Sequence, residues 1–156
     1  MADEERPLAD RGNRDVPVIA NFAASEGLTP DLALISPAKR ARETWDLFKT
    51  ALPAPPAQQF DPRLYAATAD RLLHLVRETP ADTRSLLLVG HNPGFEDLAR
   101  ALTGSGATDA LIRFGGSMPT ASLAVIDLPG EWADVQPRTG RLEIFVTPKS
   151  LGGQAD

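Results

Sequence analysis

The amino-acid sequence predicts an α/β protein with a mostly parallel sheet and an antiparallel pair of strands near the C-terminus. Short apolar runs are followed within a few residues by helical patterns, which is typical of strands in a parallel sheet. The last two apolar runs, Ala121–Asp127 and Arg141–Thr147, are joined by a turn-rich segment, which favours an antiparallel pair. The 156 residues fit a single domain, residues 1–156, whose elements are separated by fourteen prolines and twelve glycines.

The first predicted helix precedes the first strand. Its apolar positions recur at spacings of three and four residues and are Val16, Ile19, Ala20 and Ala23. Because proline is tolerated best in the first turn, Pro17 places the helix start near Asn13–Asp15, with Asp10 as a competing cap. Gly27 ends the helix, and the strand Asp31–Ile35 follows.

A second helix is expected directly after this strand. Ser36 is interpreted as its N-cap and Pro37 as its first residue, and the helix continues to about Leu52. A proline-rich loop, Leu52–Ala57, comes next. The later elements are a helix over Ala67–Thr79, a strand over Ser85–Val89, a helix over about Gly94–Leu102 and a loop that contains Gly-Ser-Gly.

The composition excludes several classes of protein. Sixteen basic and twenty-one acidic residues give a net charge of −5, which argues against a protein that coats nucleic acid. There is no cysteine, so disulfide scaffolds, thiolate zinc sites and cysteine nucleophiles are excluded. No pair of carboxylates has the spacing of a metal site and no glycine-rich nucleotide loop follows a strand, so we expect neither a metal nor a cofactor. The first ten residues are charged and no apolar run could span a membrane, so we expect a cytoplasmic protein.

Polar residues follow two of the predicted strands, at the sheet edge where ligands bind in this class of protein. After the first strand, Arg40 lies in the first turn of the next helix. A cation at this place is unfavourable against the helix dipole unless an anion lies beside it. Arg40 therefore indicates either an oxyanion ligand or a solvated surface arginine.

His91 follows the second strand in the same way. Gly90 allows a close approach of the backbone, and Pro93 favours an early helical turn. Beside free backbone N–H groups, a protonated imidazole would donate to a phosphate, whereas the alternative is a histidine that caps a loop carbonyl. The second histidine, His74, lies in the middle of a helix and is interpreted as a packing or surface residue.

Four short motifs occur in a defined order along the chain. They are Arg6-Pro-Leu-Ala-Asp-Arg-Gly12, Ser36-Pro-Ala-Lys-Arg-Ala-Arg-Glu-Thr44, Val89-Gly-His-Asn-Pro-Gly94 and Met118-Pro-Thr120. Together they resemble the histidine phosphatase superfamily, also called phosphoglycerate mutase-like, and within it the SixA-type phosphohistidine phosphatases. The resemblance runs from Arg6 to about Thr147 and implies a three-layer α/β/α sandwich.

The resemblance implies a phosphate pocket built from two histidines and two arginines. Arg40 and His91 match catalytic residues, and Ser36, Asn92 and Thr120 lie in the motifs and are expected to bind substrate. The nucleophile of the family is the histidine of an Arg-His-Gly or Arg-His-Ala motif, which ends the first strand upstream of the Arg-Pro-Leu segment. Only five residues precede that segment here, and no Arg-His pair occurs in the sequence. We therefore expect an N-terminally incomplete domain without the first strand, its arginine and the nucleophilic histidine.

Three explanations of this absence are open. The start of a longer protein is misassigned, which we favour, or the chain is a deliberate truncation, or it is a degenerate homologue that binds a ligand without catalysis. In the family the first strand is central, so its loss should leave a gap or two unpaired edges in the sheet.

The implied activity is hydrolysis of phosphohistidine on a signalling protein through a phosphohistidine enzyme intermediate. Asp61 and Glu96 are the local candidates for a general acid, which a phosphoramidate needs less than an alkyl phosphate does. Without its nucleophile, the pocket should turn over poorly. The alternatives are a small-molecule phosphomonoesterase and a non-catalytic module that binds phosphate or a phosphoprotein.

Overall fold

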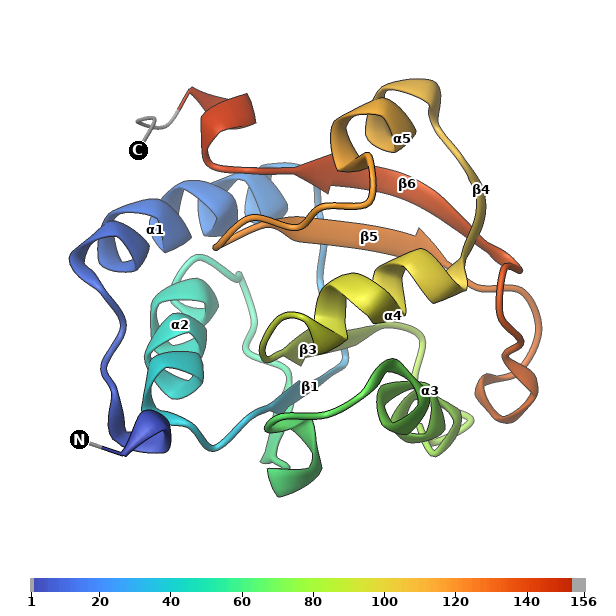
Figure 1. Cartoon of the computed structure of the whole chain (residues 1–156), viewed down its shortest axis with the longest axis horizontal. Coiled ribbons are helices and arrows are strands. Elements are labelled where there is room, and N and C mark those ends of the chain that lie inside the picture. Colours follow the sequence, from blue (N-terminus) through green and yellow to red (C-terminus); the bar gives the residue numbers. More distant parts are fainter. Residues whose placement is uncertain (1, 153–156) are drawn as a thin grey trace.

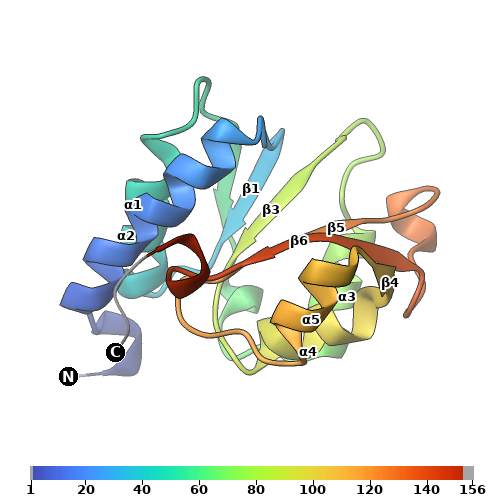
Figure 2. The same cartoon turned by 90° about the horizontal axis from the view of Figure 1, so that it is seen from above.

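The chain folds into three layers, with helices on both faces of a central β layer (Figures 1 and 2). The structure is a computed structural model and describes residues 2–152. One face is covered by α1 (Asp10–Ser25) and α2 (Lys39–Lys49). The other face carries α3 (Ala69–Arg77), α4 (Gly94–Leu102) and α5 (Thr108–Phe114). The predicted α/β/α sandwich is therefore confirmed.

The β layer consists of two three-stranded sheets. The first has the order β2-β1-β3 and is parallel throughout, with β1 at Leu32–Ile35, β2 at Ala57–Phe60 and β3 at Leu86–Val89. The second has the order β4-β6-β5, with β4 at Thr103–Gly106, β5 at Leu123–Asp127 and β6 at Gly140–Val146. β4 is parallel and β5 antiparallel to β6, so the antiparallel pair near the C-terminus is also confirmed.

Alternation along β1 divides the core between the two faces of the sheet. Ala33 and Ile35 are fully buried in a cluster with α1 and α2, whereas Leu34 belongs to the cluster with α3 and α4. Burial of apolar side chains on both faces explains why this strand is apolar at every position.

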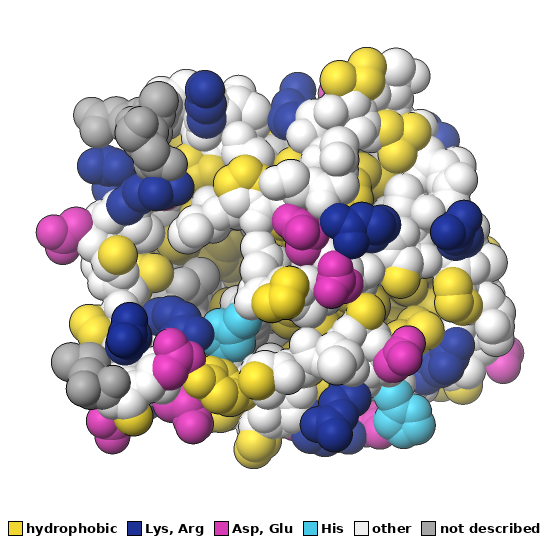
Figure 3. All heavy atoms as spheres, in the orientation of Figure 1, with side chains coloured by type: hydrophobic (Ala, Val, Ile, Leu, Met, Phe, Trp, Pro, Cys, Tyr) yellow, Lys and Arg dark blue, Asp and Glu magenta, His cyan; other side chains and the backbone are white. Residues whose placement is uncertain are grey.

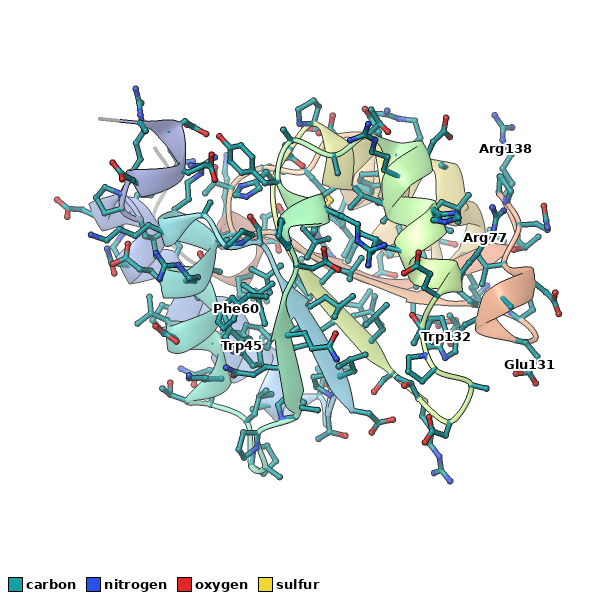
Figure 4. The ribbon with its side chains drawn as sticks, turned by 90° about the horizontal axis from the view of Figure 1, so that it is seen from below. Trp45, Phe60, Arg77, Glu131, Trp132 and Arg138 are labelled. Atoms are coloured by element: carbon teal, nitrogen blue, oxygen red, sulfur yellow. The ribbon has the colours of Figure 1, made fainter. Side chains whose placement is uncertain are left out.

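Two indole groups make hydrogen bonds near opposite edges of the first sheet (Figure 4). Trp45 of α2 donates from Nε1 to Oε1 of Gln58 at 2.8 Å, which ties the helix to β2. At the other end, Trp132 donates from Nε1 to the carbonyl oxygen of Thr83 at 2.7 Å. Beside it, Arg77 of α3 donates from Nε to the carbonyl oxygen of Val135 at 2.8 Å.

A gap separates the two sheets. Within residues 2–152, β3 pairs only with β1 and β5 pairs only with β6, so each strand has one unpaired edge. Both strands line one cavity of about 840 Å³, through Leu86–Leu88 and Leu123–Leu128. All four residues of β3 are only half-buried although each is apolar. The sheet thus has the two unpaired edges that the family resemblance led us to expect.

Two helix starts differ from the sequence prediction. α1 begins at Asp10 with Ala9 as its N-cap, so Pro17 lies inside the helix instead of in its first turn. The chain enters this helix early because the backbone N–H of Leu8 donates to Oε1 of Glu43 at 2.8 Å, while the Leu8 side chain packs against Gly12. α2 begins only at Lys39.

Two strands and one α-helix were not predicted from the sequence, namely β2, β4 and α5. β2 is exposed at all four positions and has two glutamines, so it lacks an apolar strand pattern. β4 contains the Gly-Ser-Gly segment that we assigned to a loop. Glycine is needed there because a Cβ atom on Gly104 would lie 1.8 Å from the carbonyl oxygen of Arg138.

Among the described residues, no helix combines the length and the apolar character that crossing a membrane would require.

Candidate functional site

The carboxyl ends of β1 and β3 lie at the same edge of the first sheet. The two strands are in parallel register, with Ile35 beside Val89, so Ser36 and Gly90 leave the sheet together. A cavity of about 370 Å³ lies at this edge, and its lining includes Arg40, His91, Asn92 and Thr120. The fold therefore brings the predicted site residues of both junctions to one cavity.

Ser36 lies under the site instead of on its surface. Its side chain is fully buried, and its hydroxyl accepts from the backbone N–H of Ala38 at 3.3 Å, so Ser36 turns the chain ahead of α2 and is not the N-cap that we predicted. The same hydroxyl lies 2.7 Å from Nε2 of His91. Ser36 therefore positions the imidazole, and a direct contact with substrate stays a prediction.

His91 is held half-buried at the end of β3. Burial lowers its pKa below the usual 6.5, the positive charge of Arg40 lowers the pKa further, and Asp3 partly opposes both effects. The lowered pKa favours the neutral imidazole in the free protein at pH 7. A bound anion would favour its protonated form, which can donate to phosphoryl oxygens.

Arg40 binds an anion from the chain itself. The arginine donates from Nη2 to Oδ2 of Asp3 at 3.1 Å and from Nη1 to the carbonyl oxygen of Asp3 at 2.9 Å. Asp3 belongs to a short 3₁₀ helix, Asp3–Glu5, beside α2. Figure 3 shows acidic and basic side chains gathered in this corner of the molecule, next to a recess. Arg40 therefore has an anion beside it at the helix N-terminus, but this anion is a carboxylate of the protein, and the oxyanion ligand stays a prediction.

Tyr65 completes this group and was not identified from the sequence. Its hydroxyl donates to Oδ2 of Asp3, and its ring meets the imidazole of His91 edge to face, with centroids 5.4 Å apart at 81°. The hydrogen bond to Asp3 is the largest cause of a raised pKa of Tyr65. Tyr65 follows the end of β2, a third strand that ends at this edge. If β2 had been recognised in the sequence, Tyr65 could have been predicted to lie near the site.

Asn92 fixes the opposite wall of the cavity. Its Oδ1 accepts from the backbone N–H of Glu96 at 3.1 Å, and its Nδ2 donates to the carbonyl oxygen of Met118 at 2.6 Å. Glu96 in turn accepts from the backbone N–H of Met118 at 2.7 Å. These bonds hold the segment that brings Thr120 to the cavity.

The two candidates for a general acid are both engaged elsewhere. Asp61 pairs with Arg63, whose hydrogen bond is the largest cause of a lowered pKa of Asp61, so this carboxyl is a poor proton donor. Glu96 holds the backbone of Met118. His74 lies on the outer face of α3 with its side chain 74% exposed, so of the two predicted alternatives, a packing or a surface residue, it is the surface residue. Among residues 2–152, no group of three or more metal-ligating side chains could hold a metal ion.

Comparison with known proteins places this geometry in a fold class. A proposed phosphohistidine phosphatase SixA from Agrobacterium tumefaciens superposes with a TM-score of 0.78 at 28% identity, covering 95% of this chain and 87% of that chain. A proposed SixA from Nakamurella multipartitia gives a TM-score of 0.75 at 23% identity, covering 95% of this chain and 88% of the other. The fold of this protein is that of the SixA-like histidine phosphatases, and the likeness supports a phosphatase-type hydrolase.

Curated relatives show the family more closely. A Mycobacterium tuberculosis protein is 34% identical over 151 residues, which are 96% of this chain and 93% of that protein. A Mycobacterium leprae protein is 31% identical over 150 residues, which are 96% of this chain and 91% of that protein. Both are described as uncharacterised. No family model matches the sequence. The chain belongs to the family of these mycobacterial proteins.

Proposed function

We propose that this protein is a phosphohistidine phosphatase whose substrate is a phosphohistidine-containing signalling protein. The observation that carries the proposal is the convergence of Arg40 and His91 on one cavity at the N-termini of α2 and α4. A helix N-terminus favours an anion, and an arginine supplies paired donors for phosphoryl oxygens.

Each residue then has a distinct task. Arg40 neutralises the charge of the phosphoryl group. His91, protonated when the anion binds, donates to a phosphoryl oxygen and stabilises the charge that develops during transfer. Asn92 and Thr120 orient the group from the opposite wall of the cavity.

The covalent step needs a histidine besides the two in this sequence, since His74 lies on the exposed face of α3. In that step the P–N bond of the substrate breaks, a new P–N bond forms to the nucleophilic imidazole, and the protonated substrate imidazole leaves. Water then attacks the phosphorus, the P–N bond to the enzyme imidazole breaks, the imidazole takes up a proton, and phosphate is released. Because no such nucleophile is present, we propose that this chain binds phosphoryl groups but turns over poorly.

The gap between β3 and β5 supports this interpretation. A strand placed there, parallel to β3, would pair with both unpaired edges and would end beside His91. A histidine at the end of such a strand would face the phosphoryl group that Arg40 holds.

The test is an extended protein with an upstream apolar strand that ends in Arg-His, and a matched control that ends in Arg-Asn. We expect hydrolysis of a phosphohistidine peptide by the Arg-His protein only, with a loss of about 100-fold or more when Arg40→Met is added. If the Arg-His protein folds and remains inert on both phosphohistidine and aryl phosphates, the enzyme proposal is wrong. Activity on aryl phosphates alone would instead identify a small-molecule phosphomonoesterase.

A second function is favoured by the cavity of the present chain, which keeps Arg40 and His91 without a nucleophile. We infer that the chain can also act as a non-catalytic module for phosphate or a phosphoprotein. Titration with inorganic phosphate should show saturable binding that the Arg40→Met variant loses. Equal binding by both proteins would contradict this function.

A further inference from the structure

Oδ2 of Asp3 accepts hydrogen bonds from two side chains that are distant in the sequence. Arg40 donates from Nη2 at 3.1 Å, and the Tyr65 hydroxyl donates to the same oxygen. These two hydrogen bonds, which are the two largest causes, lower the pKa of Asp3, so the carboxylate is ionised at neutral pH. Two donors from separate elements thus meet at one anionic oxygen.

Both donors lie near His91, and Arg40 lines the same cavity as the imidazole. The Tyr65 ring contacts the imidazole edge to face, and the charge of Arg40 acts on the imidazole strongly enough to lower its pKa. A phosphoryl oxygen is an anionic acceptor like a carboxylate oxygen, so an arginine and a phenol that hold one can hold the other.

Asp3 is held in this corner by few other contacts. Its side chain is 54% exposed, and the 3₁₀ helix Asp3–Glu5 has no buried residue. The carboxylate can therefore leave without opening the core. An exposed ion pair such as that between Asp3 and Arg40 contributes little free energy, so a dianion that enters the cavity can compete with Asp3 for Arg40.

Resting on the proposed function, we propose that Arg40 and Tyr65 form an oxyanion subsite that the Asp3 carboxylate fills in the free protein, so that a phosphoryl group binds by displacing Asp3. Tyr65 is then a substrate-binding residue, and Asp3 is an internal competitor that lowers the affinity of the site for anions.

The experiment measures binding of inorganic phosphate to the full chain at fixed ionic strength by ³¹P NMR or calorimetry. Asp3→Asn should tighten binding by up to about fivefold, the range of an exposed ion pair. Glu5→Gln is the matched control, because it removes the same charge from the same turn but has no bond to Arg40 in the described structure. It should change the affinity less than Asp3→Asn does.

Tyr65→Phe separates two roles of the tyrosine. Loss of a donor to the anion should weaken phosphate binding by about threefold to tenfold in the Asp3→Asn background, the range for the net contribution of one ordinary hydrogen bond. If Tyr65 only holds Asp3, Tyr65→Phe has no effect in that background, and the subsite proposal is overturned. Circular dichroism and thermal unfolding show that each variant is folded.

The outcomes distinguish this proposal from the proposed function. Phosphate binding that depends on Arg40, with Asp3→Asn no better than Glu5→Gln, would overturn the competitor role and leave the phosphoryl site standing. Absence of phosphate binding in both the natural chain and Asp3→Asn would overturn both.

Discussion

The two strand-to-helix junctions that build the site differ in the sheet that supports them. β1 is paired on both edges, and three of its four residues are buried. β3 is paired on one edge only, and all four of its residues are half-buried. The Arg40 half of the site therefore rests on a strand that is paired on both edges, whereas the His91 half borders the gap.

Ser36 couples the two halves. It leaves β1 fully buried, and its hydroxyl lies 2.7 Å from Nε2 of the His91 imidazole on the other junction. Ser36, at the end of the doubly paired strand β1, therefore orients His91, at the end of the singly paired strand β3, through one short contact at the carboxyl edge of the sheet.

The largest expected difference concerns stability. Leu34 of β1 and Leu88 of β3 are register partners of identical chemistry, but Leu34 is 7% exposed whereas Leu88 is half-buried and lines the large cavity. Leu34→Ala should lower the free energy of unfolding by about 2–5 kcal/mol and Leu88→Ala by less, because the Leu88 side chain buries less apolar area. Urea unfolding of both variants measures the difference.

The extended protein provides a second test of the difference between Leu34 and Leu88. If an added strand fills the gap, Leu88 becomes more buried, and the cost of Leu88→Ala should approach that of Leu34→Ala. Equal costs in the present chain would contradict the view that β3 is the less supported strand.

The sequence could predict the α/β class and the common edge for a physical reason. An apolar run such as Leu86–Val89 can be recognised as a strand from its own residues alone. Parallel strands in one sheet have their carboxyl ends at the same edge, and this does not depend on the structure of the loops that join them. Arg40 and His91 therefore converge although they lie far apart in the chain.

The parts that sequence reasoning missed depend on long-range contacts. β2 has no apolar pattern, so Tyr65 beyond it was not placed at the edge. The bond between Asp3 and Arg40 joins residues 37 positions apart, and no spacing rule indicates it. Likewise, the packing of Leu8 on Gly12 starts α1 early and overrides the preference of Pro17 for a first turn.

A smaller effect is expected from the polar residue that begins each junction. Ser36→Ala removes a fully buried hydroxyl and leaves the Ala38 N–H and His91 Nε2 without their partner, which should cost about 2 kcal/mol. Asn92→Ala removes two exposed hydrogen bonds, to the N–H of Glu96 and the carbonyl oxygen of Met118, whose groups can bind water instead, which should cost about 1 kcal/mol. Thermal and urea unfolding check the order of the two, and a larger cost for Asn92→Ala would reverse the assignment of the better-supported junction.

The smallest expected effect is on the titration of His91, which NMR follows through its imidazole protons. Its pKa lies below 6.5 because of burial and the charge of Arg40, so the unfolded chain binds a proton first as the pH falls. His91 therefore lowers the free energy of unfolding below about pH 6.5 and does not lower it above that pH.

Arg40→Met should raise the pKa of His91 by removing a like charge, and Asp3→Asn should lower this pKa by removing a favourable negative charge. The two variants thus shift the titration of His91 in opposite directions. Shifts of the same sign would show that the two junctions do not share one electrostatic site.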